Sequence, residues 1–394
     1  MELSKKVKSI TPSQTIEITN TARQLKAEGV DVISLSAGEP DFNTPDEIID
    51  AVNAAAKAGH TKYTASAGLP ELREAIAKKM QRDNNLTYDS TEIYVGNGAK
   101  QVLYNIFLAT LNPGDEVIVP SPYWVSYTEQ IKMVGGEPVT AVTGEDTHFK
   151  LTPELLKAHL TEKTKMLVLN SPNNPTGSVY SKDELQALAD VLAHTDIIIV
   201  VDEIYEVLTY GTKHVSIASL SDEVKARTII VNGVSKSHSM TGWRVGYACG
   251  DAELISALAA LTSQSTTSVA EPAQYGAIAA YNMDPGETET YRAIFERRRD
   301  NAYEKISELP HVTCLKPEGA FYLFPHMQTC AETCGYKTVN EFVKDILREK
   351  HVAFVPGSGF GAPEYARISY SLGEEKFNEA ISRIKEFIEE KTQL

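Results

Sequence analysis

Five short apolar runs, separated by other segments, constrain the fold of this 394-residue chain more than any other feature. They lie at 92–95, 116–119, 166–169, 197–201 and 228–231. None alternates apolar with polar residues, which is typical of strands buried on both faces of a parallel sheet. Helical segments lie between several runs, and one of them begins with a capping box formed by Ser181 and Glu184. The sequence therefore predicts an α/β fold with a mostly parallel central sheet flanked by helices.

The pattern changes after about residue 285. We expect a long charged helix, two shorter strands and a final amphipathic helix, at 288–309, 320–323, 352–355 and 374–391. This indicates a separate α+β unit. The expected division is an N-terminal arm with part of a small domain (1–45), a large ligand-binding domain (46–285) and a C-terminal small domain (286–394).

Charge and cysteine content exclude several classes of protein. A net charge of −15 argues against nonspecific binding to nucleic acid or anionic membranes. We expect no signal peptide and no membrane span, because no apolar stretch has the required length. Four cysteines are too few for a disulfide framework, so a cytoplasmic protein is expected. Cys330 and Cys334 lie near His326 but lack a fourth ligand at a recognisable spacing, so we expect no metal site.

Lys236 stands just past the run 228–231, between two serines, and Arg244 follows eight residues later. A lysine amine can bond covalently to an aldehyde cofactor, while hydroxyl and guanidinium groups, here Ser235 and Arg244, can hold its phosphate. The alternative is a solvated lysine in a polar loop, and the other motifs argue against it.

Asp202 closes the run 197–201. A carboxylate at the end of a buried strand is costly unless it has a positive partner, and a protonated pyridine nitrogen would be one. The alternative is a helix N-cap. Tyr205 could contact a phenolic oxygen on the same ring, or simply pack in the core.

Three further motifs also follow predicted strands. Two prolines and a glycine stiffen the loop 170–177, which can hold an amide side chain in a fixed place. Gly96–Lys100 offers backbone N–H groups at a helix start to an anion, although Gln101 breaks the dinucleotide pattern. Trp124 could stack on a flat ring. Because ligands bind beyond the carboxyl ends of parallel strands, these motifs predict one shared site.

Near the C-terminus, Arg367 alternates with apolar residues in the strand-like run 365–370. Its bidentate geometry suits a substrate carboxylate, and an internal salt bridge is the alternative.

Together these motifs resemble the aspartate aminotransferase family, the class I aminotransferases of pyridoxal 5'-phosphate (PLP) fold type I. The resemblance covers nearly the whole chain, at 36–42, 62–73, 170–177, 202–205, 235–247 and Arg367. Several independent motifs in the right order make the match specific. It implies that PLP binds within 46–285, and that two subunits form a homodimer with shared sites.

The resemblance also implies roles for individual residues. Lys236 would bind PLP covalently and then move the substrate Cα proton, and Asp202 would pair with the pyridine nitrogen. The other implied cofactor contacts are Gly98, Ala99, Trp124, Asn174, Tyr205, Ser235 and Arg244, with Tyr63 coming from the other subunit. The implied substrate contacts are Gly38, Trp124, Asn174, Arg367, Lys100 and Thr15.

The substrate expectation depends on Lys100. The best-known dicarboxylate enzymes use an arginine from the segment that matches 261–267, and this chain has none there. The chain is more similar to a bacterial thermophile-type subgroup, in which a lysine matching Lys100 and a threonine matching Thr15 serve the distal carboxylate. The charge of Lys100 opposes the helix dipole, which favours a functional role over that of an exposed lysine.

We therefore expect a ping-pong aspartate aminotransferase with 2-oxoglutarate as the amino acceptor. Aromatic amino acids or prephenate are possible additional substrates. The alternative is a PLP-dependent lyase of the same fold. A DNA-binding regulator is not expected, because the acidic chain shows no basic winged-helix segment.

Overall fold

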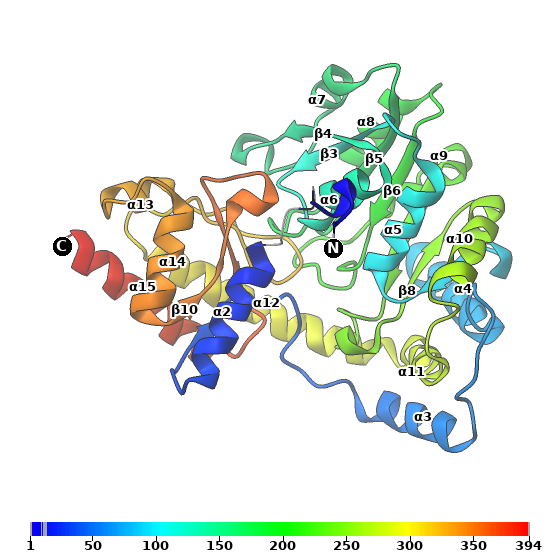
Figure 1. Cartoon of the computed structure of the whole chain (residues 1–394), viewed down its shortest axis with the longest axis horizontal. Coiled ribbons are helices and arrows are strands. Elements are labelled where there is room, and N and C mark those ends of the chain that lie inside the picture. Colours follow the sequence, from blue (N-terminus) through cyan, green and yellow to red (C-terminus); the bar gives the residue numbers. More distant parts are fainter. Residues whose placement is uncertain (1, 9, 11–13, 393–394) are drawn as a thin grey trace.

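A computed structural model describes residues 2–8, 10 and 14–392 (Figure 1). Its main feature is a seven-stranded sheet with the strand order β2-β8-β7-β6-β5-β3-β4. The strands are β2 (Ile93–Gly96), β3 (Glu116–Ser121), β4 (Glu137–Val142), β5 (Thr164–Asn170), β6 (Ile198–Asp202), β7 (Thr228–Gly233) and β8 (Gly246–Cys249). Neighbours from β4 to β7 are parallel, whereas β8 runs antiparallel to both β2 and β7. The predicted α/β fold with a mostly parallel sheet is confirmed.

Both faces of this sheet are covered. In β5, Leu167 and Leu169 belong to one hydrophobic core, while Met166 and Val168 belong to another on the opposite face. The first core includes residues of α3 (Asp46–Lys57), α4 (Pro70–Asn84), α7 (Pro153–His159), α8 (Lys182–Leu192), α9 (Asp222–Ala226) and α11 (Glu271–Asn282). The second includes residues of α5 (Ala99–Thr110), α6 (Ser126–Val134) and α10 (Ala252–Ser265). Because both faces are covered by apolar residues, the strands of this sheet can present polar groups to a ligand only at their ends.

A third core lies outside the large sheet. The two small sheets near it pair β1 (Ile33–Ser34) with β10 (Val352–Ala353), and order β11 (Val355–Pro356), β12 (Ala366–Ser369) and β9 (Tyr322–Leu323). The helices of this part are α2 (Gln14–Ala27), α12 (Pro285–Ser307), α13 (Gln328–Thr333), α14 (Val339–Lys350) and α15 (Glu374–Thr392), and a short α1 (Lys5–Lys8) precedes them. Figure 1 shows α2 beside β10, and α2 also contacts β11. N-terminal residues such as Ile18 and Leu35 thus share a core with the C-terminal third of the chain.

Most predicted elements are present with small shifts at their ends. The capping box of α8 is formed, with Glu184 N–H donating to Ser181 Oγ at 3.3 Å and Ser181 N–H donating to Glu184 Oε2 at 2.7 Å. The expected strand at 352–355 is two strands instead, because the chain changes sheets at the buried Phe354. β4 and β8 were not among the expected strands. The proposed domain boundaries remain a prediction.

Among the residues that the structure describes, no helix has both the length and the apolar character needed to cross a bilayer.

Candidate active site

A cavity of about 400 Å³ lies where the carboxyl ends of the central strands meet. Asn170 ends β5 and is paired in register with Asp202, which ends β6. Ser235 and Lys236 follow the end of β7 and line the same cavity. The parallel register therefore brings residues far apart in sequence to one edge of the sheet.

Most of the predicted site residues line this cavity. They are Gly38, Ala99, Lys100, Trp124, Asn174, Asp202, Tyr205, Ser235, Lys236, Arg244 and Arg367. Of the others, Gly98 lies against Arg244, so that a side chain at this position would collide with the guanidinium. Tyr63 lies away from the cavity lining and is 87% exposed. Thr15 falls within α2, but its side chain lies outside the described residues. The roles assigned to all these residues remain predictions.

Asp202 is a buried carboxylate whose hydrogen-bond donors are both neutral. The Tyr127 hydroxyl donates to Oδ2 at 2.7 Å, and the Ile204 N–H donates to Oδ1 at 3.2 Å. Burial raises the pKa of Asp202 to about 6, against the opposing effect of these two donors. A cation placed in the cavity would therefore stabilise the ionised carboxylate.

Lys236 lines the same cavity, and its positive charge acts to lower the pKa of Asp202. Its Nζ donates to the Gly38 carbonyl oxygen. Loss of solvation lowers the pKa of Lys236 to about 8 from its ordinary 10.5, while Glu39 acts in the opposite direction. A lysine of this kind is partly neutral near physiological pH, as a nucleophile or a proton acceptor requires.

Arg367 enters the cavity from β12 and is 3% exposed. One terminal nitrogen donates to Asn174 Oδ1 at 3.0 Å, and the other donates to the Ser36 carbonyl at 2.9 Å. Its Nε is buried with no hydrogen-bond partner among the described residues. An unpaired buried donor is costly, and a ligand carboxylate would satisfy it.

The start of α5 forms a corner suited to an anion. Gly98 caps the helix with φ of 85°, a conformation that glycine adopts readily. Arg244 is held beside it by hydrogen bonds to the carbonyls of Thr241 at 2.9 Å and Asn97 at 3.3 Å. Free N–H groups at a helix N-terminus and a fixed guanidinium together favour a phosphate.

Lys100 lies at the same rim, with its Nζ 4.7 Å from the centre of the Trp124 ring. The Trp124 indole packs edge to face against the Tyr127 ring, with ring centres 5.3 Å apart. The charge of Lys100 is thus held over an aromatic face at the opening of the cavity, where it could meet the far end of a substrate.

Sequence reasoning missed several residues that line the cavity, including Asn170, Tyr127, Thr241 and Tyr322. Tyr127 follows Trp124 by three residues, and this helical spacing could have identified it. Tyr322 gives no local signal, because its hydrogen-bond partner Tyr205 lies 117 residues earlier in the chain.

Comparison with known proteins agrees with this geometry. The family described as aminotransferase class I and II matches residues 30–384. An aspartate aminotransferase of Bacillus subtilis is 55% identical over 390 residues, which cover 99% of both chains. A probable aspartate/prephenate aminotransferase of Aquifex aeolicus is 49% identical and covers 98% of this chain and 99% of its own. The solved structure of Thermus thermophilus aspartate aminotransferase with maleate has a TM-score of 0.94 and 41% identity, with 98% of this chain and all of that chain covered.

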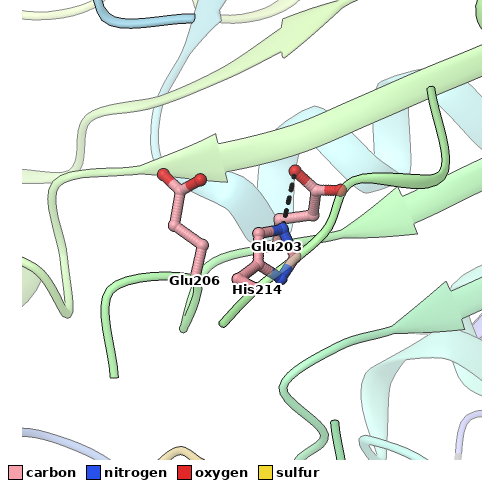
Figure 2. Close-up of side chains that lie close together, drawn as sticks. All are labelled: Glu203, Glu206 and His214. Carbon is pink, nitrogen blue, oxygen red and sulfur yellow. Dashed lines mark ion pairs between the residues drawn. The ribbon is translucent and has the colours of Figure 1, made fainter. Parts of the chain in front are cut away.

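A second group of ionisable residues, Glu203, Glu206 and His214, is outside the cavity lining. Figure 2 shows these side chains close together. Their nearest ligand atoms all lie within 4.8 Å of one another, and His214 Nε2 is 3.4 Å from Glu203 Oε2. Carboxylates and imidazole in this arrangement can bind a metal ion. The Lys79 ammonium, however, already pairs with Glu206, and Asn84 and Asn232 donate to the same carboxylate.

The charges in this group balance without an ion. Burial alone would lower the pKa of His214, but the carboxylates of Glu203 and Glu206 raise it above its ordinary 6.5. Below this raised pKa His214 is protonated, and His214 and Lys79 together offset two carboxylates. A divalent ion would leave a net positive charge in a buried place, so we interpret the group as a charge network.

His214→Gln should destabilise the protein most at mildly acidic pH. The folded pKa of His214 lies above its unfolded value, so its contribution is fully present below about pH 6.5 and is lost as the pH rises through the folded pKa. Urea unfolding should show a loss of about 3 kcal/mol at pH 6, because Glu203 loses its partner, and a smaller loss at pH 9. His60→Gln is the control, since that half-exposed histidine also contacts a glutamate. A loss that is the same at every pH would mean that His214 is neutral in the folded chain.

Proposed function

The chain belongs to the class I and II aminotransferase family and is a PLP-dependent enzyme, and we propose that it transfers the amino group of L-aspartate to 2-oxoglutarate. One observation carries the proposal. A single cavity holds an amine of lowered pKa, a buried carboxylate with neutral donors and a guanidinium with an unpaired Nε, from Lys236, Asp202 and Arg367.

The residues of the cavity fit PLP. When bound, PLP supplies an aldehyde carbon for the amino group and a ring that accepts electrons from the substrate Cα. Asp202 would hold a proton on the pyridine nitrogen, which provides the cation that this carboxylate otherwise lacks. Arg244, Ser235 and the start of α5 would hold the phosphate. Asn174 would share the phenolic oxygen with Tyr205, because its Oδ1 already accepts from Arg367 and its Nδ2 is left to donate.

Lys236 has two tasks in this proposal. It holds the cofactor between turnovers. Once released, it would take the proton from the substrate Cα and deliver it to the cofactor carbon. A pKa of about 8 leaves this amine close to the optimum for proton transfer near neutral pH.

Donor and acceptor would use the cavity in turn. Arg367 offers one unpaired Nε, and a cavity of about 400 Å³ suits one small substrate beside the cofactor. The keto acid product of the donor must leave before the acceptor binds, which is ping-pong order. The chain's relatives carry aminotransferase names, so we do not favour the lyase alternative.

Substrate choice is inferred from Lys100. A dicarboxylate held by Arg367 at its α-carboxylate would place its second carboxylate toward the rim, where Lys100 lies. The Thermus thermophilus enzyme was solved with maleate, itself a dicarboxylate, which supports a dicarboxylate substrate here. Thr15 is proposed to assist. The name of the Aquifex aeolicus relative supports prephenate as a further substrate. Aromatic amino acids are also proposed, because the flexible ammonium of a lysine selects a distal carboxylate less strictly than the planar guanidinium of an arginine.

We also propose that the enzyme works in the cytoplasm as a homodimer. Tyr63 is 87% exposed in the single chain, although it belongs to a motif of the family. A hollow of about 710 Å³ adjoins the site and shares Lys100 and Arg244 with it. A second subunit would cover this hollow and bring its own Tyr63 to the phosphate.

Borohydride reduction of the purified holoenzyme should leave a pyridoxyl group on Lys236, detected by mass spectrometry of its peptide. Lys236→Ala should lose the adduct and about 10⁴-fold in turnover, because the base is removed. Lys150→Ala is the control, since this lysine pairs with Glu184 outside the cavity lining. This variant should keep both the adduct on Lys236 and the turnover rate. An adduct on a different lysine would refute the assignment.

The covalent uptake of PLP by the apoprotein should depend on the neutral form of Lys236. Its rate should rise about tenfold per unit between pH 6 and 7 and level off above pH 8, because the pKa of the amine is about 8. Timed borohydride trapping measures this rate. A rate that keeps rising up to pH 10 would indicate an ordinary lysine.

Lys100→Ala should raise KM for aspartate about tenfold, as expected for one lost charge contact, and leave KM for phenylalanine nearly unchanged. Lys305→Ala removes the same charge from an exposed pair with Glu308 and should change neither value. Coupled detection of the keto acid product measures both substrates, and ammonia release serves as the check for lyase activity. Equal effects on both substrates would exclude the distal-carboxylate role.

A further inference from the structure

Tyr322 is a cavity residue that none of the sequence motifs includes. It lies in β9, is fully buried, and its hydroxyl is 2.9 Å from the hydroxyl of Tyr205. The two rings meet nearly at right angles with centres 5.9 Å apart. The Arg367 guanidinium lies over the Tyr322 ring, 4.5 Å from its centre. Tyr322 is therefore held in place by both its hydroxyl and its ring.

Either of the two hydroxyls could be the donor in this hydrogen bond. Burial raises the pKa of Tyr205 and of Tyr322 above the ordinary 10, so both phenols keep their protons at neutral pH. In the pair, one phenol must donate and the other must accept. If Tyr205 donated to Tyr322, it would have no proton left for a ligand in the cavity.

Packing favours the opposite direction. The Tyr322 oxygen lies so close to Gly38 that a Cβ atom there would be 3.2 Å away. Among the described residues, the Tyr205 oxygen is the one hydrogen-bond partner found for the Tyr322 hydroxyl. Both tyrosines line the cavity, and Tyr205 is the one proposed above to contact the phenolic oxygen of the ligand, which can accept its proton. Every donor is satisfied when Tyr322 donates to Tyr205 and Tyr205 donates onward.

We infer that Tyr322 is a positioning residue, whose hydroxyl directs the Tyr205 proton to the phenolic oxygen of the cofactor. The inference rests on the proposed function, because PLP supplies that oxygen. A phenol that accepts one hydrogen bond becomes a stronger donor of the next, so Tyr322 also strengthens the contact between Tyr205 and the cofactor.

This arrangement affects the cofactor-linked nitrogen of Lys236. A strong donor on the phenolic oxygen withdraws negative charge from it, and the nearby nitrogen then holds its proton less tightly. Removing the Tyr322 hydroxyl weakens that donor, so the nitrogen should hold its proton more tightly. If Tyr205 instead donated to Tyr322, removing the acceptor would free the Tyr205 proton and shift the titration the other way.

The test is an absorbance titration of the holoenzyme. In Tyr322→Phe the midpoint of the cofactor band should move up by about 0.3 of a pH unit relative to the unsubstituted enzyme. A downward shift, or no shift, would overturn the inference. Tyr322→Met also lacks the hydroxyl but packs flexibly, and it should shift in the same upward direction if the phenylalanine variant does not fold.

Two controls separate a positioning role from a general packing effect. In a Tyr205→Phe background, Tyr322→Phe should cause no additional shift, and a full shift there would show that Tyr322 does not act through Tyr205. Tyr370→Phe removes another buried hydroxyl of the same core, one that donates to the Ala320 carbonyl, and should leave the midpoint unchanged. If the unsubstituted protein takes up no PLP, the proposed function itself fails, which is a different result from an absent shift.

Discussion

The buried carboxylate of Asp202 is the interaction on which the site depends. The apolar residues of β6 contribute to cores on both faces of the sheet, so the strand can carry a charge only at its end. At that end Asp202 accepts hydrogen bonds from two neutral donors and keeps a raised pKa. A buried charge of this kind favours a cationic ligand, and Lys236 is placed to hold one in the same cavity.

The cavity is lined by residues from both the large sheet and the three-stranded sheet. Asp202 and Lys236 follow strands of the large sheet, whereas Arg367 and Tyr322 lie in the three-stranded sheet of the C-terminal part. Tyr205 follows β6 but packs in the same core as Tyr322. The arginine that would bind the substrate and the lysine that would react with it are therefore brought together only when both parts of the chain are folded.

Much of this could be predicted from the sequence, because many of the signals are local. Uninterrupted apolar runs identified the central strands, and the serine and glutamate of α8 identified its start. β8 was not expected, because it begins with a glycine inside the motif 235–247, which we interpreted for its chemistry and not for its secondary structure. β4 is an edge strand with mostly exposed or half-buried residues, so it lacks the apolar run that marked the others. Tyr322 and the charge network depend on contacts between distant segments, which a single sequence does not display.

The charge network of Glu203, Glu206, His214 and Lys79 also has an evolutionary consequence. Each of its members is needed to offset another in a buried place, so a change at one position alone leaves an unbalanced charge. Replacing both members of a pair by apolar residues of similar volume removes that penalty, and is often tolerated in buried ion pairs. Substitutions at these four positions should therefore covary among relatives, whereas residues of the surrounding apolar core can be substituted independently.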